Sequence, residues 1–174
     1  MTIIGVMGSG QNEWPELAEP LGIWIAHHGF DLLTGAGQGV MLSVARAFSS
    51  VQGRKGRSIG IMPSKTDSRL GFIPIEGYPN QFIDLPILTP LPRKEAGSSA
   101  SALNRNYVNV LTSDVVVALP GSKGTLDEIC LSVRFGKPLI CVGPVDAFMG
   151  IPKDTPIAST LDEVFSFIAH HATV

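Results

Sequence analysis

Short apolar runs alternate along the chain with longer stretches whose apolar residues recur every three or four positions. The short runs predict buried strands and the longer stretches predict amphipathic helices. Thr160 is the predicted N-cap of the last helix, and Glu163 completes a capping box with it. The predicted strands are residues 3–7, 31–34, 58–62, 81–88, 114–119 and 139–142, and the predicted helices are residues 14–28, 40–49, 101–111, 125–135 and 161–170.

This alternation of strands and helices predicts a doubly wound α/β fold, a Rossmann-like parallel sheet with helices on both faces. Residues 115–119 are apolar throughout, as expected for a strand that is covered on both sides. The whole chain, residues 1–174, is predicted to form one such domain. Residues 64–97 depart from the pattern because they are rich in proline and glycine, and we interpret them as a long functional excursion over the sheet edge.

Composition narrows the possible partners. Apolar residues make up 44% of the chain and charged residues 16%, which is typical of a well-packed globular protein. The formal net charge of -2 offers no basic face to nucleic acid or to an anionic membrane. The start of the chain resembles neither a signal peptide nor a membrane span, which predicts a cytoplasmic protein. Cys130 and Cys141 are predicted to be buried thiols, and their spacing predicts no structural metal.

Three glycine-rich turns follow predicted strands, and the carboxyl ends of parallel strands share one edge of a sheet. We therefore expect the turns to lie together. A glycine turn that leads into a helix lets backbone N–H groups approach an anion at the positive end of the helix dipole. The candidate ligand-binding residues are Gly8, Ser9 and Gly10 in the first turn, Gly35, Ala36, Gly37, Gly39, Val40 and Met41 in the second, and Gly121, Ser122, Lys123, Gly124 and Thr125 in the third.

Each turn also has a plainer explanation, because any of them can be a tight connection or a site of close helix packing. NAD binding is not predicted, since Glu13 stands where the dinucleotide fingerprint needs a third glycine. The second strand also lacks the acid that would bind a ribose, because it ends in Thr34 and Gly35. Three such turns in one short domain exceed what connections require, which favours a shared phosphorylated ligand.

A further candidate precedes the strand at residues 114–119. There, Arg105 lies between two amide side chains, Asn104 and Asn106. We interpret Arg105 as a guanidinium that reaches into the cleft and clamps a phosphate. The alternative is a solvated surface arginine.

Residues 120–128, Pro-Gly-Ser-Lys-Gly-Thr-Leu-Asp-Glu, resemble the PGGxGTxxE signature of a family misleadingly known as lysine decarboxylases, which includes the Lonely Guy phosphoribohydrolases. The resemblance implies that Arg105 and Glu128 match the catalytic arginine and glutamate of those hydrolases. Two positions depart from the pattern: Ser122 replaces the second glycine, and Asn106 stands where the hydrolases carry a lysine.

The chain resembles the molybdenum cofactor carrier branch of this family more closely, through residues 4–10, 35–41, 60–63 and 104–106. That resemblance implies a homodimer or homotetramer that binds and protects molybdenum cofactor, a phosphorylated molybdopterin. The implied partners are molybdenum enzymes or cofactor synthesis proteins. The third turn would hold the phosphate of the cofactor. The Gly8 and Gly35 turns would hold its molybdate end, and residues 64–97 would cover the pterin. Two alternatives remain: a hydrolase of nucleoside 5′-monophosphates, and a degenerate member that only binds proteins.

Overall fold

A seven-stranded sheet with strand order β6-β3-β2-β1-β7-β8-β9 forms the centre of the computed structural model, which describes residues 2–93 and 102–172. Every neighbouring pair of its strands runs parallel, so the predicted doubly wound sheet is confirmed. The strands are β1 (Ile3–Met7), β2 (Asp31–Thr34), β3 (Ser58–Met62), β6 (Leu85–Leu88), β7 (Val115–Ala118), β8 (Leu139–Val142) and β9 (Ile157–Ala158).

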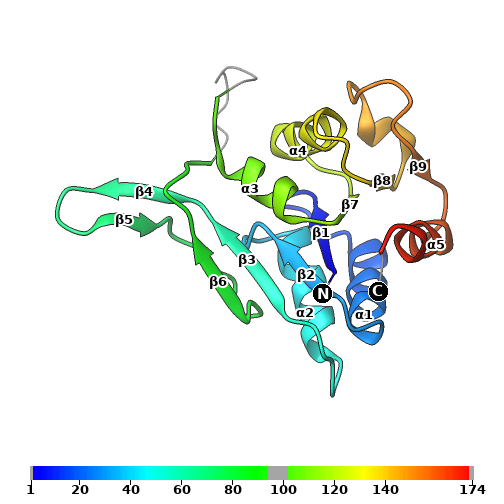
Figure 1. Cartoon of the computed structure of the whole chain (residues 1–174), viewed down its shortest axis with the longest axis horizontal. Helices are drawn as coiled ribbons and strands as arrows, with labels where there is room; N and C mark the ends of the chain where they lie inside the picture. The colour runs from blue at the N-terminus through cyan, green and yellow to red at the C-terminus, as the bar shows by residue number, and fades with distance from the viewer. Residues whose placement is uncertain (1, 94–101, 173–174) are drawn as a thin grey trace.

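Helices cover both faces of the sheet, as Figure 1 shows. The strands alternate their side chains between two apolar layers, so that Val115 and Val117 face one layer whereas Val116 and Ala118 face the other. Burial on both faces explains why β7 is apolar at every position. The first layer contains α1 (Pro15–His27), α2 (Val40–Ser50) and α5 (Leu161–His171), and the second contains α3 (Arg105–Thr112) and α4 (Lys123–Arg134).

The order of the strands reverses between β1 and β7. From β1 the chain builds outward through β2 and β3 to β6, and then returns to place β7 on the other side of β1. In open α/β sheets, ligands bind outside the carboxyl ends of the strands at such a switch point. The first and third glycine turns follow β1 and β7, and therefore flank this point.

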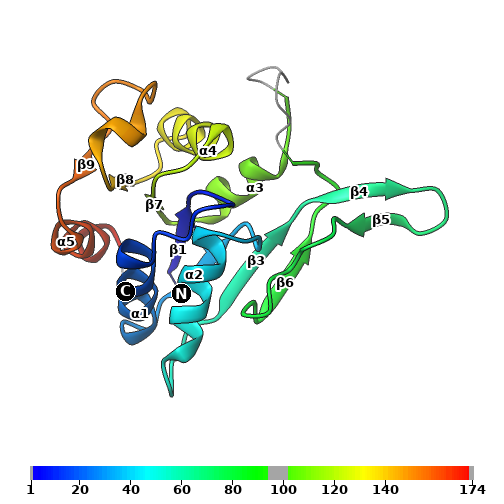
Figure 2. The same cartoon turned by 180° about the vertical axis from the view of Figure 1, so that it is seen from behind.

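The excursion after β3 contains more structure than the sequence predicts. Its first part forms an antiparallel hairpin of β4 (Ser64–Asp67) and β5 (Gly71–Pro74), which projects from the body in Figure 2. The predicted strand at residues 81–88 is four residues too long at its start, because the Asn80 side chain accepts a bond from the Phe82 N–H and holds that segment in a turn. The last part of the excursion, residues 94–97, lies outside the described residues.

Other differences from the predicted elements are local. Helix α3 begins at Arg105 rather than at residue 101, because the side chain of Asn104 caps the Asn106 N–H; residue 101 itself lies outside the described residues. Thr160 caps α5 as predicted. Cys141 is buried as predicted, but Cys130 is exposed, because it lies on the outer side of α4. The short helix η1 (Val145–Phe148) and β9 are not predicted.

No helix within residues 2–93 and 102–172 is long and apolar enough to cross a membrane.

Two helical glycines allow a test of this packing. A Cβ on Gly22 of α1 would lie 2.4 Å from the Val44 carbonyl oxygen of α2, whereas a Cβ on Gly124 of α4 would meet no atom within 4 Å. We expect Gly22→Ala to lower the free energy of unfolding by about 1–3 kcal/mol. Gly124→Ala should leave it unchanged or raise it by up to about 1 kcal/mol, because alanine favours helix. Urea unfolding followed by circular dichroism measures both, and an unaffected Gly22→Ala would contradict the close contact of α1 with α2.

Candidate functional site

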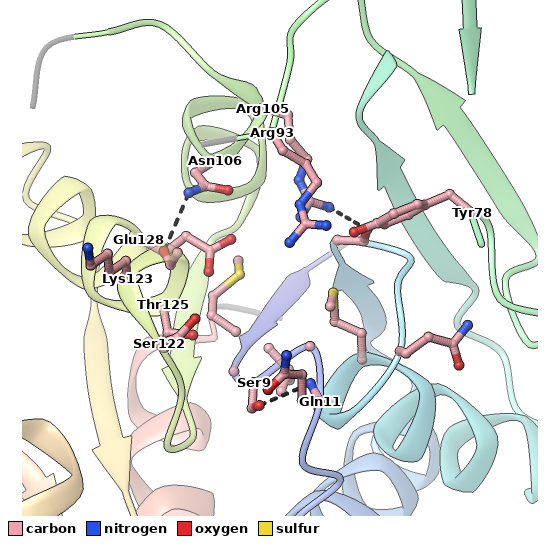
Figure 3. A pocket seen from close by; sticks show the side chains of 18 of the residues that line it. Ser9, Gln11, Tyr78, Arg93, Arg105, Asn106, Ser122, Lys123, Thr125 and Glu128 are labelled. Atoms are coloured by element: carbon pink, nitrogen blue, oxygen red, sulfur yellow. Dashed lines mark hydrogen bonds between the residues drawn. The ribbon is translucent and has the colours of Figure 1, made fainter. Parts of the chain in front are cut away.

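A cavity of about 780 Å³ opens at the carboxyl edge of the sheet, beside the switch point (Figure 3). All three predicted turns contribute to its wall, and so does the start of α3. Twelve of the residues predicted from the sequence line it: Gly8, Ser9, Gly10, Gly35, Met41, Arg105, Asn106, Ser122, Lys123, Gly124, Thr125 and Glu128.

The remaining predicted residues do not line this cavity. A Cβ on Gly39, which has a φ of 64°, would lie 2.3 Å from the Ser9 carbonyl oxygen. The second turn therefore packs directly on the first. The other predicted residues that do not line it are Ala36, Gly37, Val40, Asn104 and Gly121.

The peptide groups of Ser9 join the three turns. The Ser9 N–H donates to the Pro120 carbonyl oxygen at 3.1 Å, and the Ser9 carbonyl oxygen accepts from the Val40 N–H at 2.9 Å. The Ser9 hydroxyl accepts from the N–H groups of Gln11 and Asn12, and so shapes its own turn. Ser9 thereby fixes the first turn against both others.

The N-terminus of α4 is the best anion site in the cavity wall. The helix begins at Lys123 after Ser122, and no side chain caps it. Its first-turn N–H groups have no acceptor within the helix, and they lie at the positive end of its dipole. The space beside Gly124 is open, and the Lys123 side chain adds a positive charge. An anion can therefore approach this turn closely.

Arg105 lies on the opposite wall from Ser122 and Thr125 (Figure 3), and only 7% of its surface is exposed. Its Nη1 donates to the carbonyl oxygens of Gly35 and Ile61, at the ends of β2 and β3. The side chain also hydrogen-bonds to Tyr78, and its Nε is buried without a partner among the described residues. Arg105 is thus not the solvated surface arginine of the alternative interpretation.

Glu128 is the second buried ionisable group of the cavity. Its Oε1 accepts from Asn109 Nδ2 at 2.8 Å. Burial raises the pKa of Glu128 to about 7, although the charge of Arg105 and the Asn109 bond oppose the rise. Burial also lowers the pKa of Arg105, and the charge of Glu128 opposes that. Near neutral pH the carboxyl group is therefore partly protonated.

The two asparagines around Arg105 connect α3 to α4. Asn106 Nδ2 donates to Asp127 Oδ2 at 2.9 Å, and Asn104 Nδ2 donates to the same oxygen at 3.3 Å. These bonds join the start of α3 to Asp127 of α4. They explain why amide side chains flank the arginine.

Several lining residues are missed by the sequence analysis, and they come mainly from the excursion. Glu76, Gly77, Tyr78 and Arg93 border the cavity, together with Gln11, which follows the first glycine turn, and Gln38, which lies within the second. Asn80 holds the excursion there, because its N–H donates to the Ala36 carbonyl oxygen and its Nδ2 to that of Gly37. The length of the proline- and glycine-rich segment indicates a functional loop, but nothing in its sequence identifies these residues.

Within the described ranges, no group of three or more His, Cys, Asp and Glu side chains is placed to hold a metal ion.

The fold and the cavity define a Rossmann-like protein with a cavity at its switch point. The chain belongs to the SLOG cluster4 family, whose profile matches residues 1–168. It is similar to an uncharacterised protein of Archaeoglobus fulgidus, with 29% identity over 143 residues that make up 81% of this chain and 80% of that protein.

Two solved structures share the fold over nearly their whole length. The molybdenum cofactor binding protein of the phototrophic bacterium Rippkaea orientalis is 30% identical, with a TM-score of 0.72 over 99% of this chain and 98% of that one. The molybdenum cofactor carrier protein of Chlamydomonas reinhardtii is 26% identical, with a TM-score of 0.68 over 97% of this chain and 96% of that one.

The raised pKa of Glu128 predicts a pH-dependent stability. The folded-state pKa of about 7 lies above the ordinary value of 4.5, so the native state binds more protons and loses stability as pH rises through 7. The Glu128→Gln variant does not lose this stability, because a glutamine side chain does not titrate. From about pH 5 to pH 8, its free energy of unfolding should rise relative to the wild type by up to about 3 kcal/mol.

Urea unfolding of both proteins across this pH range measures the difference. Glu16→Gln, at an exposed position of α1, is the matched control and should follow the wild type at every pH. A Glu128→Gln curve that stays parallel to the wild-type curve would show that Glu128 titrates normally.

Proposed function

We propose that this protein binds, protects and carries molybdenum cofactor, the phosphorylated molybdopterin, in the cavity at the carboxyl ends of its strands. The observation that carries the proposal is the convergence of the uncapped α4 N-terminus and the buried Arg105 on one cavity of about 780 Å³. That volume lies within the range of small-molecule sites, roughly 300–1,000 Å³. The similarity to the Rippkaea orientalis protein supports the choice of ligand.

The phosphate of the cofactor is assigned to the first turn of α4. Its free N–H groups, the hydroxyl groups of Ser122 and Thr125, and the charge of Lys123 provide donors and a positive field on one wall. Gly124 leaves the backbone accessible there.

The remainder of the ligand is assigned to the space toward Arg105. Arg105 lines the cavity there, and its guanidinium cation fits the anionic molybdate end, with the Gly8 turn alongside. The Gly35 turn contributes indirectly, because a Cβ at Gly35 would collide with the guanidinium. Tyr78 and Arg93, from the excursion, would cover the pterin ring.

A carrier needs no general acid or base, so it tolerates Asn106 in place of the lysine of the hydrolases. We propose that this cytoplasmic protein is a homodimer or homotetramer. It would exchange its ligand with molybdenum enzymes or cofactor synthesis proteins.

Substitution of Gly124 tests the phosphate site. Gly124→Asp places a carboxylate in open space against the ligand phosphate, and we expect at least a tenfold loss of affinity for molybdenum cofactor. Gly124→Ala adds only a methyl group and should bind within about twofold of the wild type. The measurement is the fluorescence of the oxidised pterin that remains with the purified protein. Wild-type affinity in Gly124→Asp would place the phosphate elsewhere, and a wild type without saturable binding would refute the carrier.

A second function is favoured by one observation, the buried Glu128 with a pKa of about 7 beside Arg105. In this alternative the protein is a phosphoribohydrolase of nucleoside 5′-monophosphates. Arg105 would hold the phosphate, and Glu128 would stabilise the oxocarbenium-like ribose or activate water.

Incubation with AMP or a cytokinin riboside monophosphate tests the alternative by the release of free base. If the protein is a hydrolase, Glu128→Gln should lower kcat by roughly 10²–10⁴-fold, whereas Glu16→Gln should leave it unchanged. A base-release rate that is equal in wild type and Glu128→Gln would dismiss this function.

A further inference from the structure

A second, smaller cavity of about 220 Å³ lies next to the first, on the other side of the α4 N-terminus. Ser122, Lys123 and Thr125 line both cavities, so the turn that is assigned to the phosphate separates them. The outer wall of the second cavity is the segment after β8, which lies beside α4 in Figures 1 and 2.

The two cavities differ in chemistry. Arg93 and Arg105 line the first cavity alone, whereas the second shares Lys123 with it and is otherwise lined mainly by residues with apolar side chains. Its apolar wall comprises Leu126, Ile129, Ala147, Phe148, Met149 and Ile151. Phe148 is buried, whereas the neighbouring Met149 is 83% exposed, so its side chain is free to contact a ligand in this cavity. A flexible thioether beside an aromatic ring suits a flat ligand with apolar faces.

The position in the fold points to a nucleotide. Doubly wound sheets consist of two halves, each able to bind one mononucleotide, on either side of the switch point. The first cavity draws its walls from the turns after β1, β2 and β7, and the second lies over the other half, between α4 and the segment after β8. Its volume lies below the range of complete ligand sites, so it suits one part of a longer ligand.

We propose that the second cavity binds the nucleoside of a dinucleotide form of the cofactor, in which a pyrophosphate joins the molybdopterin to a nucleoside. The pyrophosphate lies across the α4 N-terminus, the molybdopterin fills the first cavity, and the base stacks between Met149 and the Phe148 side of the second. Lys123, which borders both cavities, neutralises the additional phosphate charge. This inference rests on the proposed function and specifies its ligand class.

The test compares affinities for two forms of the same cofactor: molybdopterin that ends in its monophosphate, and its guanosine and cytidine dinucleotide forms. A stacked base is worth roughly ten- to a hundredfold in affinity, so the wild type should bind one dinucleotide form at least tenfold more tightly than the monophosphate form. Ala147→Trp fills the second cavity from an exposed position. It should abolish this preference and keep the wild-type affinity for the monophosphate form within twofold.

Val145→Trp is the matched control, because Val145 is 70% exposed on the same short helix but does not line the cavity. It should retain the full preference. Equal wild-type affinities for the forms, or a preference that survives Ala147→Trp, would overturn the inference while leaving the carrier function intact. A change of oligomeric state in Ala147→Trp without a change in preference would overturn it as well, and would assign the apolar wall to a second copy of the chain. Failure of every form to bind the wild type would refute the proposed function itself, and this inference with it.

Discussion

The site depends on the backbone of one residue, Ser9. Its N–H reaches the third turn at Pro120, its carbonyl oxygen reaches the start of α2 at Val40, and its hydroxyl holds the residues that follow it. Buried peptide groups need hydrogen-bond partners, and these bonds therefore hold the three turns in fixed positions relative to one another. Strands β1 and β7 are neighbours at the switch point. The bonds of Ser9 join the turns that follow these strands into one continuous wall of the cavity.

The glycines of the three turns serve this packing more than they serve a ligand. A Cβ on Gly39 would strike the first turn, and one on Gly121 would strike the Thr125 side chain. Gly124 differs, because the space beside it is empty. Several glycines of the three turns therefore permit close packing, whereas Gly124 leaves open space beside the backbone. A glycine-rich sequence alone does not distinguish these two uses, because both demand the same missing side chain.

The sequence predicts those parts of the fold in which burial of the side chains determines the residue types. Strands such as residues 3–7 and 58–62 are buried on both faces, so their apolar runs mark their bounds. The β4–β5 hairpin carries exposed residues, Phe72 among them, and so leaves no such pattern. Tyr78 reaches the cavity only because Asn80 bonds to the second turn across 43 residues of chain, a long-range contact that no local pattern encodes. The position of Arg105 could be predicted, but its bonds to the ends of β2 and β3 could not.

The Arg105–Glu128 pair determines how the cavity attracts an anion although the chain as a whole carries a net charge of -2. Arg105 keeps its charge inside the protein because carbonyl oxygens and Tyr78 accept its hydrogen bonds. Glu128, with a pKa of about 7, cancels that charge only in part near neutral pH. An anion bound beside Arg105 would repel the carboxylate and raise the pKa of Glu128 further, so binding would take up a proton and leave the arginine charge to the ligand. A weakly acidic protein thus presents a locally positive site through one buried arginine and one carboxyl group that can lose its charge.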